Sequence, residues 1–171
     1  MKNILLSIMV TAVVIIIAGL IFIFSGVYNV SAMEPDHGII KWVLETTSDR
    51  SVDARAKDIK VPNLENPKMI EEGLSHYKEM CESCHRAPGK DESELARGLN
   101  PDAPDLVKFG YRIPAEKLFW VTKNGIKMTG MPAWGKTHSD DKIWAIVAAV
   151  KKLNTISPEK YDSVKVEEDD D

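Results

Sequence analysis

The longest run of apolar positions lies near the N-terminus, where residues 4–24 carry no charged side chain. About 21 such residues can cross a hydrocarbon core of roughly 30 Å as a helix, so the pattern predicts a single transmembrane anchor within residues 1–32. A cleaved signal peptide is the alternative, because residues 30–32 (Val-Ser-Ala) resemble a cleavage site. The apolar region of a signal peptide is usually shorter, about 7–15 residues.

Charges on the two sides of this run predict its orientation. Lys2 precedes the apolar run, and Glu34 and Asp36 follow it. The positive-inside rule therefore places the N-terminus in the cytoplasm and all later residues on the outer side of the membrane.

Residues 33–65 are predicted to form a tether with short helices. Pro35 and Asp36 suit a first helical turn. Apolar side chains then follow at helical spacing at Ile39, Ile40, Val43 and Leu44, with Trp42 beside them. Two interpretations stay open: this helix lies on the membrane surface, or it packs against the domain that follows. Residues 51–59 are charged and are predicted to be helical as well.

Three further helices are predicted from capping residues followed by apolar stripes. The first covers residues 66–81, with Asn66 as its N-cap and proline at the next position. The second covers residues 114–124 and ends before a glycine. The third covers residues 139–153, with Ser139 as its N-cap and acidic residues in its first turn.

The remaining segments are predicted to lack regular structure. Residues 86–104 and 127–135 are rich in proline and glycine and are predicted to be loops. The pattern as a whole predicts an all-α domain over residues 66–156. Residues 157–171 are predicted to be a solvated acidic tail, since they end in the like-charge block 167–171.

Two cysteines and a histidine in one pentapeptide, Cys81-Glu82-Ser83-Cys84-His85, form the c-type haem attachment signature. Each thiol adds to one haem vinyl group, and His85 becomes the proximal axial ligand of the iron. We therefore predict covalently bound haem c, one per chain. Pro101 and Pro104 are the candidates for the backbone carbonyl that accepts a hydrogen bond from the second ring nitrogen of His85. The alternative is that both are ordinary loop prolines. The sequence does not distinguish these two prolines.

Other uses of the two cysteines fit less well. A zinc site needs two more ligands, yet these are the only cysteines in the chain, and the histidines form no H-x₃₋₅-H pair. A thioredoxin-like redox motif belongs in a βαβ setting, whereas a helix is predicted before Cys81. A disulfide between residues three apart closes almost no loop and adds little stability.

The second axial position of the iron is assigned to Met131. Gly130 allows close approach of the backbone, and Pro132 keeps Met131 out of helical geometry. Met128 is the competing ligand. His76 and His138 are possible donors but are poorly placed along the chain.

Three side chains are candidates for hydrogen bonds to the haem propionates: Trp134, Tyr111 and Arg112. Trp donates only and Arg is always charged, so both suit a buried carboxylate. The alternative is that Trp134 is a packing residue and Arg112 a surface residue.

Residues 67–155 resemble a class I c-type cytochrome of the single-haem, membrane-anchored bacterial kind. The resemblance rests on Gly73, Tyr77 and Cys81 at steps of four, on the pentapeptide, on Gly-Met-Pro-Ala-Trp-Gly over residues 130–135, and on the closing helix. It implies a cytochrome c fold, in which the N- and C-terminal helices of the domain cross around the haem.

The same resemblance implies that the crossing lies at Gly73, opposite Ile146 and Ala149. Ala149 departs from the aromatic residue often found there. The crossing is then either looser than in the family, or Trp144 fills the gap.

The resemblance implies single-electron transfer by Fe(II)/Fe(III) cycling, rather than catalysis. It further implies a bacterial inner membrane location, with the haem domain on the periplasmic side and respiratory or photosynthetic redox partners. Neither a small-molecule substrate nor nucleic acid is expected, in keeping with the net charge of -4. Two alternatives stay open: a haem c subunit of a larger membrane oxidoreductase, and a haem redox or gas sensor.

Basic residues between positions 108 and 136 predict a docking face for an acidic redox partner. They are Lys108, Arg112, Lys117, Lys123, Lys127 and Lys136, with Glu116 as the only acidic residue among them. The acidic block 167–171 could cover this face when no partner is bound. The alternative is an ordinary solvated surface.

Overall fold

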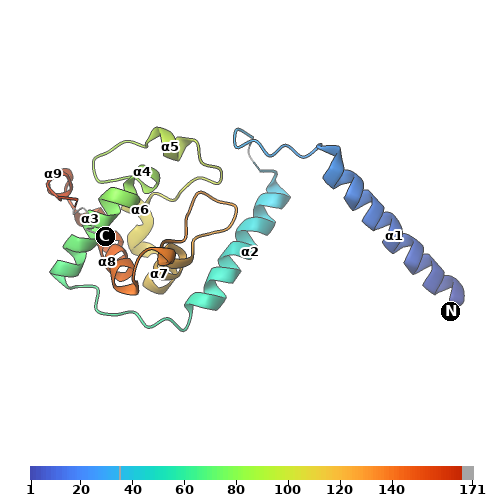
Figure 1. The fold of residues 1–171 in the computed structure, drawn as a ribbon, viewed down its shortest axis with the longest axis horizontal. Coiled ribbons are helices and arrows are strands. Elements are labelled where there is room, and N and C mark those ends of the chain that lie inside the picture. The colour runs from blue at the N-terminus through green and yellow to red at the C-terminus, as the bar shows by residue number, and fades with distance from the viewer. Residues whose placement is uncertain (35, 167–171) are drawn as a thin grey trace. The chain divides into compact units, whose positions relative to one another are not determined.

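The computed structural model describes residues 1–34 and 36–166 (Figure 1). The chain divides into two compact units, residues 1–34 and the part from residue 35 onward. In the first unit, α1 (Lys2–Ser25) ends at Gly26, whose φ of 66° gives a left-handed cap. An 18-residue window of α1 has a mean hydropathy of 3.0, so the helix is long and apolar enough to cross a membrane. A signal sequence has the same property.

The second unit begins with one long helix, α2 (Gly38–Ala56). The prediction of several short helices was wrong: the segments around residues 39–44 and 51–56 are parts of one helix, because no proline or internal glycine interrupts them. The helix begins after His37, later than predicted from Pro35 and Asp36, and Pro35 lies outside the described residues. The C-terminal half of α2 packs against α7 (Ala115–Asn124) and buries Val52 and Ala56.

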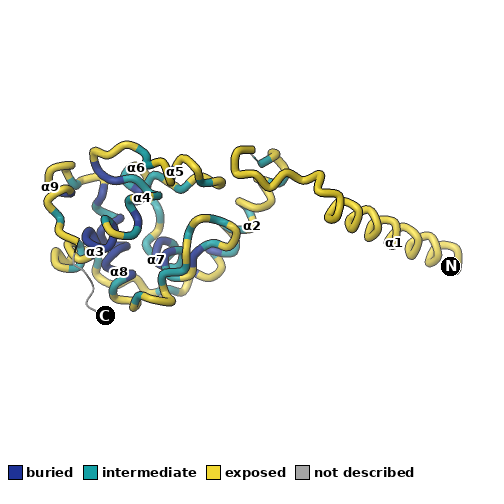
Figure 2. Tube along the Cα trace, turned by 45° about the horizontal axis from the view of Figure 1, so that its top comes forward, coloured by how far each residue is buried: buried dark blue, intermediate teal, exposed yellow. Residues whose placement is uncertain are grey.

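The core of this unit is the crossing of α3 (Pro67–Met80) and α8 (Asp140–Lys152) (Figures 1 and 2). The Asn66 side chain accepts a hydrogen bond from the backbone N–H of Lys68 (3.0 Å), so the predicted N-cap of α3 is present. At Gly73 the two backbones approach so closely that an added Cβ would lie 1.8 Å from the carbonyl oxygen of Ala145. The crossing is therefore close, and its nearest residue on α8 is one position before the expected Ile146.

Trp144 packs on α7, which is a second helix in contact with α8. Its ring stacks on Phe119 of α7, with ring centroids 4.1 Å apart and planes 16° apart. Ala149 is fully buried, and its Cβ lies 3.0 Å from the Cβ that alanine would place at position 73. Two small residues, rather than Trp144, thus account for the close contact between the helices.

Short helices connect these long ones and lie partly within segments that were predicted to be loops. They are α4 (Glu82–His85), α5 (Glu94–Arg97), α6 (Leu106–Phe109) and the 3₁₀ turns η1 (Gly110–Arg112), η2 (Trp134–Lys136) and η3 (Leu153–Thr155). The described residues contain helices and no strand, so the predicted all-α fold class is confirmed.

The C-terminal segment is more ordered than predicted. Ser157 caps α9 (Pro158–Asp162), and Tyr161 in this helix is completely buried. The prediction of a solvated tail from residue 157 was wrong, because Tyr161 packs edge-to-face on Tyr77 with ring centroids 6.4 Å apart. The acidic block 167–171 lies outside the described residues.

Candidate functional site

The predicted attachment pentapeptide is a tight turn that continues α3. The backbone N–H of Cys81 donates to the carbonyl of Tyr77 (2.9 Å), and the N–H groups of Cys84 and His85 both donate to the carbonyl of Cys81. Both thiols are free rather than joined in a disulfide. Burial raises the pKa of the Cys81 thiol to about 12. The turn thus holds two reduced thiols and an imidazole within five residues, which is the donor set that covalent haem attachment requires.

His85 is oriented by a backbone carbonyl of the following loop. Its Nδ1 lies 3.0 Å from the carbonyl oxygen of Pro104. Because a carbonyl only accepts, Nδ1 carries the proton, and Nε2 is the nitrogen left with a lone pair for a metal. Burial lowers the pKa of His85 and the bond to Pro104 opposes this shift, so the ring is favoured in its neutral form. Of the two prolines considered, Pro104 is the acceptor.

Tyr77 holds the backbone at His85 and at the residue after it, a role that the sequence analysis missed. Its hydroxyl donates toward the carbonyls of His85 (3.1 Å) and Arg86 (2.6 Å). Burial raises the pKa of Tyr77, which keeps the hydroxyl protonated as a donor. Arg86 follows with a φ of 69° and reverses the chain. The position of Tyr77, one helical turn before Cys81, is the signal that could have revealed this bond.

A second contact that sequence reasoning missed joins the pentapeptide to α9. The Tyr161 hydroxyl donates to Glu82 Oε2 (2.9 Å), and Lys90 Nζ lies 3.0 Å from the same carboxylate oxygen. The Lys78 ammonium donates to the carbonyls of Asp162 (2.9 Å) and Val164 (2.8 Å) at the end of α9. The segment predicted to be a tail therefore braces the predicted attachment site, and no motif in the sequence indicates it.

The predicted second ligand lies on a self-contained loop after α7. The N–H of Met131 donates to Thr129 Oγ1 (3.1 Å), and the N–H of Ile126 donates to the Met131 carbonyl (3.2 Å). Gly125 has a φ of 65°, and an added Cβ there would lie 2.8 Å from the carbonyl oxygen of Met131. Gly125, rather than Gly130, is thus the glycine that allows the backbone of this loop to close up.

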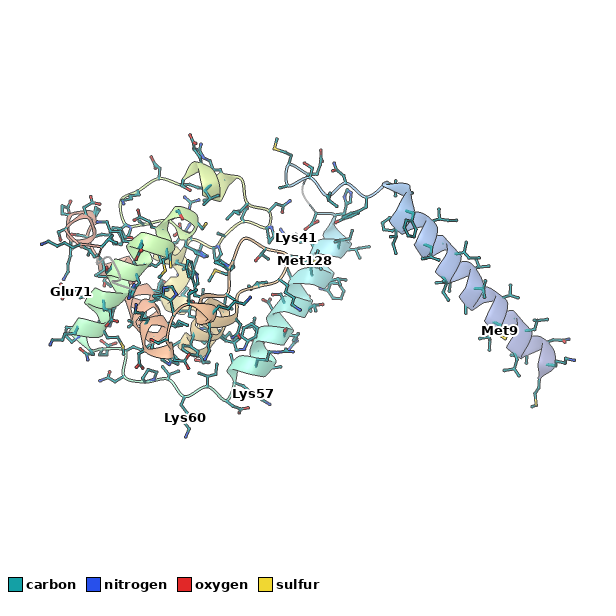
Figure 3. All side chains as sticks on the ribbon, in the orientation of Figure 1. Met9, Lys41, Lys57, Lys60, Glu71 and Met128 are labelled. Atoms are coloured by element: carbon teal, nitrogen blue, oxygen red, sulfur yellow. The ribbon has the colours of Figure 1, made fainter. Side chains whose placement is uncertain are left out.

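The two methionines of this loop differ in exposure. Met131 is half-buried, whereas Met128 is 96% exposed with a φ of 60° (Figure 3). An exposed thioether is poorly placed to bind a buried iron, so this contrast favours Met131 over Met128. Ligation by Met131 stays a prediction.

The three candidates for propionate contacts do not form one cluster of hydrogen bonds. The Arg112 Nε donates to the Tyr111 hydroxyl (2.7 Å) on the exposed turn η1. Trp134 packs instead edge-to-face on His138, with ring centroids 5.3 Å apart. Their role toward a haem stays a prediction.

Two of the histidines outside the pentapeptide contribute to packing. His76 on α3 is buried and lies edge-to-face with His138, with ring centroids 6.2 Å apart. Within residues 1–34 and 36–166, no group of three or more His, Cys, Asp or Glu side chains is arranged to hold a metal ion.

Two crossing helices, the first of which leads into a cysteine–cysteine–histidine turn with an oriented imidazole, are typical of c-type cytochrome domains. Residues 68–148 match the family described as cytochrome c oxidase, cbb3-type, subunit III, and this part of the chain is a c-type cytochrome domain. Such a domain carries covalently bound haem c and has a role in electron transfer. A search of curated proteins found no match to the chain.

Proposed function

We propose that this chain is a membrane-anchored cytochrome that binds one haem c and passes single electrons between redox proteins. The observation that carries the proposal is the hydrogen bond between His85 and Pro104, which leaves Nε2 available to the iron. When bound, the haem supplies the Fe(II)/Fe(III) couple. Cys81 and Cys84 would hold the haem through thioether bonds, and His85 and Met131 would bind its iron.

The proposed roles follow from how each residue is supported. Pro104 and Tyr77 keep the His85 ring and its backbone in one position, so little rearrangement accompanies a change of oxidation state. A thioether ligand from Met131 favours the reduced iron and raises the reduction potential.

The proposed location is a bacterial inner membrane that α1 crosses, with the domain on the periplasmic side. The length and hydropathy of α1 support the anchor, and Lys2 supports the orientation. Retention of the anchor predicts that the mature protein still begins before α1. N-terminal sequencing of the protein from membranes would expose cleavage after residue 32.

A docking face for an acidic partner is proposed among the basic residues between positions 108 and 136. Two of these residues are paired with acidic side chains, which weakens the case for this face. Lys117 pairs with Asp53, and Lys123 Nζ lies 2.5 Å from an oxygen of Asp140. Lys127 and Lys136 are exposed and remain part of the proposed face. Faster electron transfer to an acidic partner at low salt would support this face. A rate that does not change with salt would contradict it.

Carbon monoxide tests the axial ligands. We expect the optical spectrum of the reduced protein to be unchanged by carbon monoxide, because Met131 occupies the sixth position. Met131→Ala is expected to form an adduct, whereas the matched variant Met128→Ala is not, since Met128 is exposed. An adduct with the unaltered protein would contradict the ligand assignment and favour a gas or redox sensor.

The family description supports a second candidate, a haem c subunit of a cytochrome oxidase complex. In that case the chain would co-purify in mild detergent with a larger membrane oxidoreductase. Removing the chain would then lower oxygen consumption by that complex. Purification of the chain alone, with oxidase activity unaffected by its loss, would favour the independent carrier.

A further inference from the structure

The N-terminal half of α2 exposes a group of large apolar side chains. The exposed fractions are 79% for Ile39, 65% for Trp42, 45% for Val43 and 53% for Leu44. Single exposed apolar residues are normal on a protein surface, but four within six consecutive positions indicate a surface that meets something apolar.

This apolar face is turned away from the domain. Val43 and Val52 are nine residues apart, about two and a half helical turns, so they lie on opposite sides of α2. Val52 is buried against the domain, and the neighbouring Asp53 pairs with Lys117 on α7. The contact that holds α2 to the domain therefore does not cover Val43 or Ile39, which lies one turn before it.

The first turns of α2 are amphipathic. Lys41 and Glu45 lie one turn apart on the polar side, with Lys41 Nζ 3.8 Å from Glu45 Oε1 (Figure 3). Asp49 follows one turn later on the same side. The apolar side, centred on Val43, carries no charge within residues 38–47. A helix with these two sides suits the boundary between lipid headgroups and acyl chains, and Trp42 has the side chain most typical of that boundary.

The length of chain before α2 points to the bilayer as the occupant. Residues 26–37 separate the end of α1 from the start of α2, and twelve residues reach at most about 43 Å when fully extended. Apolar exposure continues through this connection, with Val27 71%, Val30 87% and Met33 90% exposed. A helix tied this closely to a membrane anchor stays within reach of the lipid surface.

We propose that the first half of α2 lies in the interfacial region of the bilayer that α1 crosses, with Ile39, Trp42 and Val43 toward the acyl chains. This inference rests on the proposed membrane anchoring. The second half of α2 then holds the cytochrome domain through α7, so one continuous helix links the lipid surface to the helix that precedes the Met131 loop. The bound lipid is zwitterionic or neutral, because the apolar side carries no excess of basic residues.

Lipid-dependent quenching of Trp42 tests the proposal on the full haem-bound chain. The protein is reconstituted in phosphatidylcholine nanodiscs with ordinary or brominated acyl chains, and tryptophan emission is recorded. The contribution of Trp42 is the difference between the unaltered protein and Trp42→Phe. We expect brominated lipid to lower this contribution by about twofold or more, as for an indole at the acyl boundary.

Two double variants separate lipid contact from a general effect on the helix. Ile39→Ser with Val43→Ser removes apolar side chains and is expected to abolish most of the quenching. Lys41→Ser with Glu45→Ser changes the opposite side of the same turns and is expected to leave it in place. The haem absorption spectrum of each variant reports whether the domain is still folded.

The outcomes are distinguishable from failure of the anchor itself. A chain that does not co-elute with nanodiscs contradicts membrane anchoring, and with it the proposed location. A chain that co-elutes, but whose Trp42 is equally bright in both lipids, overturns the interfacial position of α2 alone. Shielding of Trp42 that requires an added second protein would also overturn it, in favour of a protein partner on this face.

Discussion

His85 and Met131 are held in place by different kinds of structure. The His85 turn extends α3, and the carbonyl of His85 accepts a hydrogen bond from Tyr77 of that helix. Two other segments also hold the turn: the His85 imidazole is bonded to Pro104, and Glu82 is bonded to Tyr161 of α9. The Met131 loop is closed by bonds among residues 126–131 alone. Long-range contacts make the histidine side rigid, whereas local contacts leave the methionine side easier to displace.

The difference suggests that the His85 turn and the Met131 loop control different properties of the protein. Rigid positioning of His85 would keep the attached haem in one position relative to the helices of the domain. Because the Met131 loop depends on local hydrogen bonds, a small substitution in it can displace Met131 while the fold remains intact. Substitutions on the two sides should therefore change different properties.

The largest expected effect is on stability at the crossing that supports the histidine side. Gly73→Ala would place Cβ 1.8 Å from the backbone oxygen of Ala145, and neither helix can yield without separating. We expect the free energy of unfolding to fall by about 3 kcal/mol or more, despite the usual gain of about 1 kcal/mol for alanine in a helix. Urea denaturation of the haem-bound protein measures this change.

Gly130→Ala is the matched control on the methionine side. Its Cβ would meet the end of the Leu99 side chain at 2.7 Å, and a side-chain end can move aside. The expected loss is about 1 kcal/mol or less. Equal losses at positions 73 and 130 would contradict the contrast between a rigid and an adaptable side.

The next prediction concerns ligation rather than stability. Gly125→Ala forces a side chain onto a φ of 65° and against the Met131 carbonyl, which displaces the loop. We expect the reduced Gly125→Ala variant to form a carbon monoxide adduct, which the unaltered protein is not expected to form. A carbon monoxide titration followed optically measures it.

Gly98→Ala serves as the control for this substitution. Its φ is -91° and its Cβ would meet only carbonyl oxygens at ordinary contact distances of 3.5 and 3.7 Å. No change in carbon monoxide binding is expected there. Unchanged binding in Gly125→Ala would argue that Met131 either is not the ligand or is held more firmly than its bonds indicate.

A smaller effect is expected at the hydrogen bond between Tyr161 of α9 and Glu82, which braces the histidine side. Burial and the bond to Glu82 raise the pKa of Tyr161 in the folded protein. Above the ordinary tyrosine pKa of about 10, the unfolded chain loses a proton that the folded chain keeps, so stability falls as pH rises, by at most about 1.4 kcal/mol per pH unit. Tyr161→Phe should lose less stability between pH 9 and 11 than the unaltered protein.

Thermal unfolding across this pH range measures the Tyr161 effect. At pH 7 the substitution leaves Glu82 with one donor fewer and should cost about 1 kcal/mol. Tyr111→Phe is the control, since the Tyr111 side chain is exposed on η1 and lies outside this contact. An identical alkaline profile for Tyr161→Phe and the unaltered protein would refute the brace.

The smallest expected effect lies where α2 meets α7, the helix before the methionine loop. The pKa of Lys117 is raised by its hydrogen bond to Asp53, yet the pair is exposed to solvent. Lys117→Ala should lower the stability only slightly, because the pair is exposed, and high salt should reduce the loss. Hydrogen exchange of α2 amides measures it, with Lys127→Ala as the control. A large loss that high salt does not reduce would mean that this pair, rather than Val52 and Ala56, holds α2.

Features that depend on neighbouring residues were predictable. The cysteine and histidine turn is local chemistry, and the cap at Asn66 and the apolar stripes of α3 and α8 follow from helical periodicity. The extent of α2 was missed, because weak apolar patterns in its two halves obscured one uninterrupted helix. The role of Tyr161 was missed because the acidic residues around it resemble those of a solvated tail.

The sequence by itself determined the helical class, the haem attachment chemistry and the candidate anchor, since each depends on residues within a few turns of one another. Only the tertiary structure decided that the carbonyl of Pro104 accepts a hydrogen bond from His85 Nδ1, that Ala145 lies against Gly73, and that α9 braces Glu82. These contacts join residues that are 19 to 79 positions apart. Their geometry depends on how the helices pack, which the order of residues along each helix does not reveal.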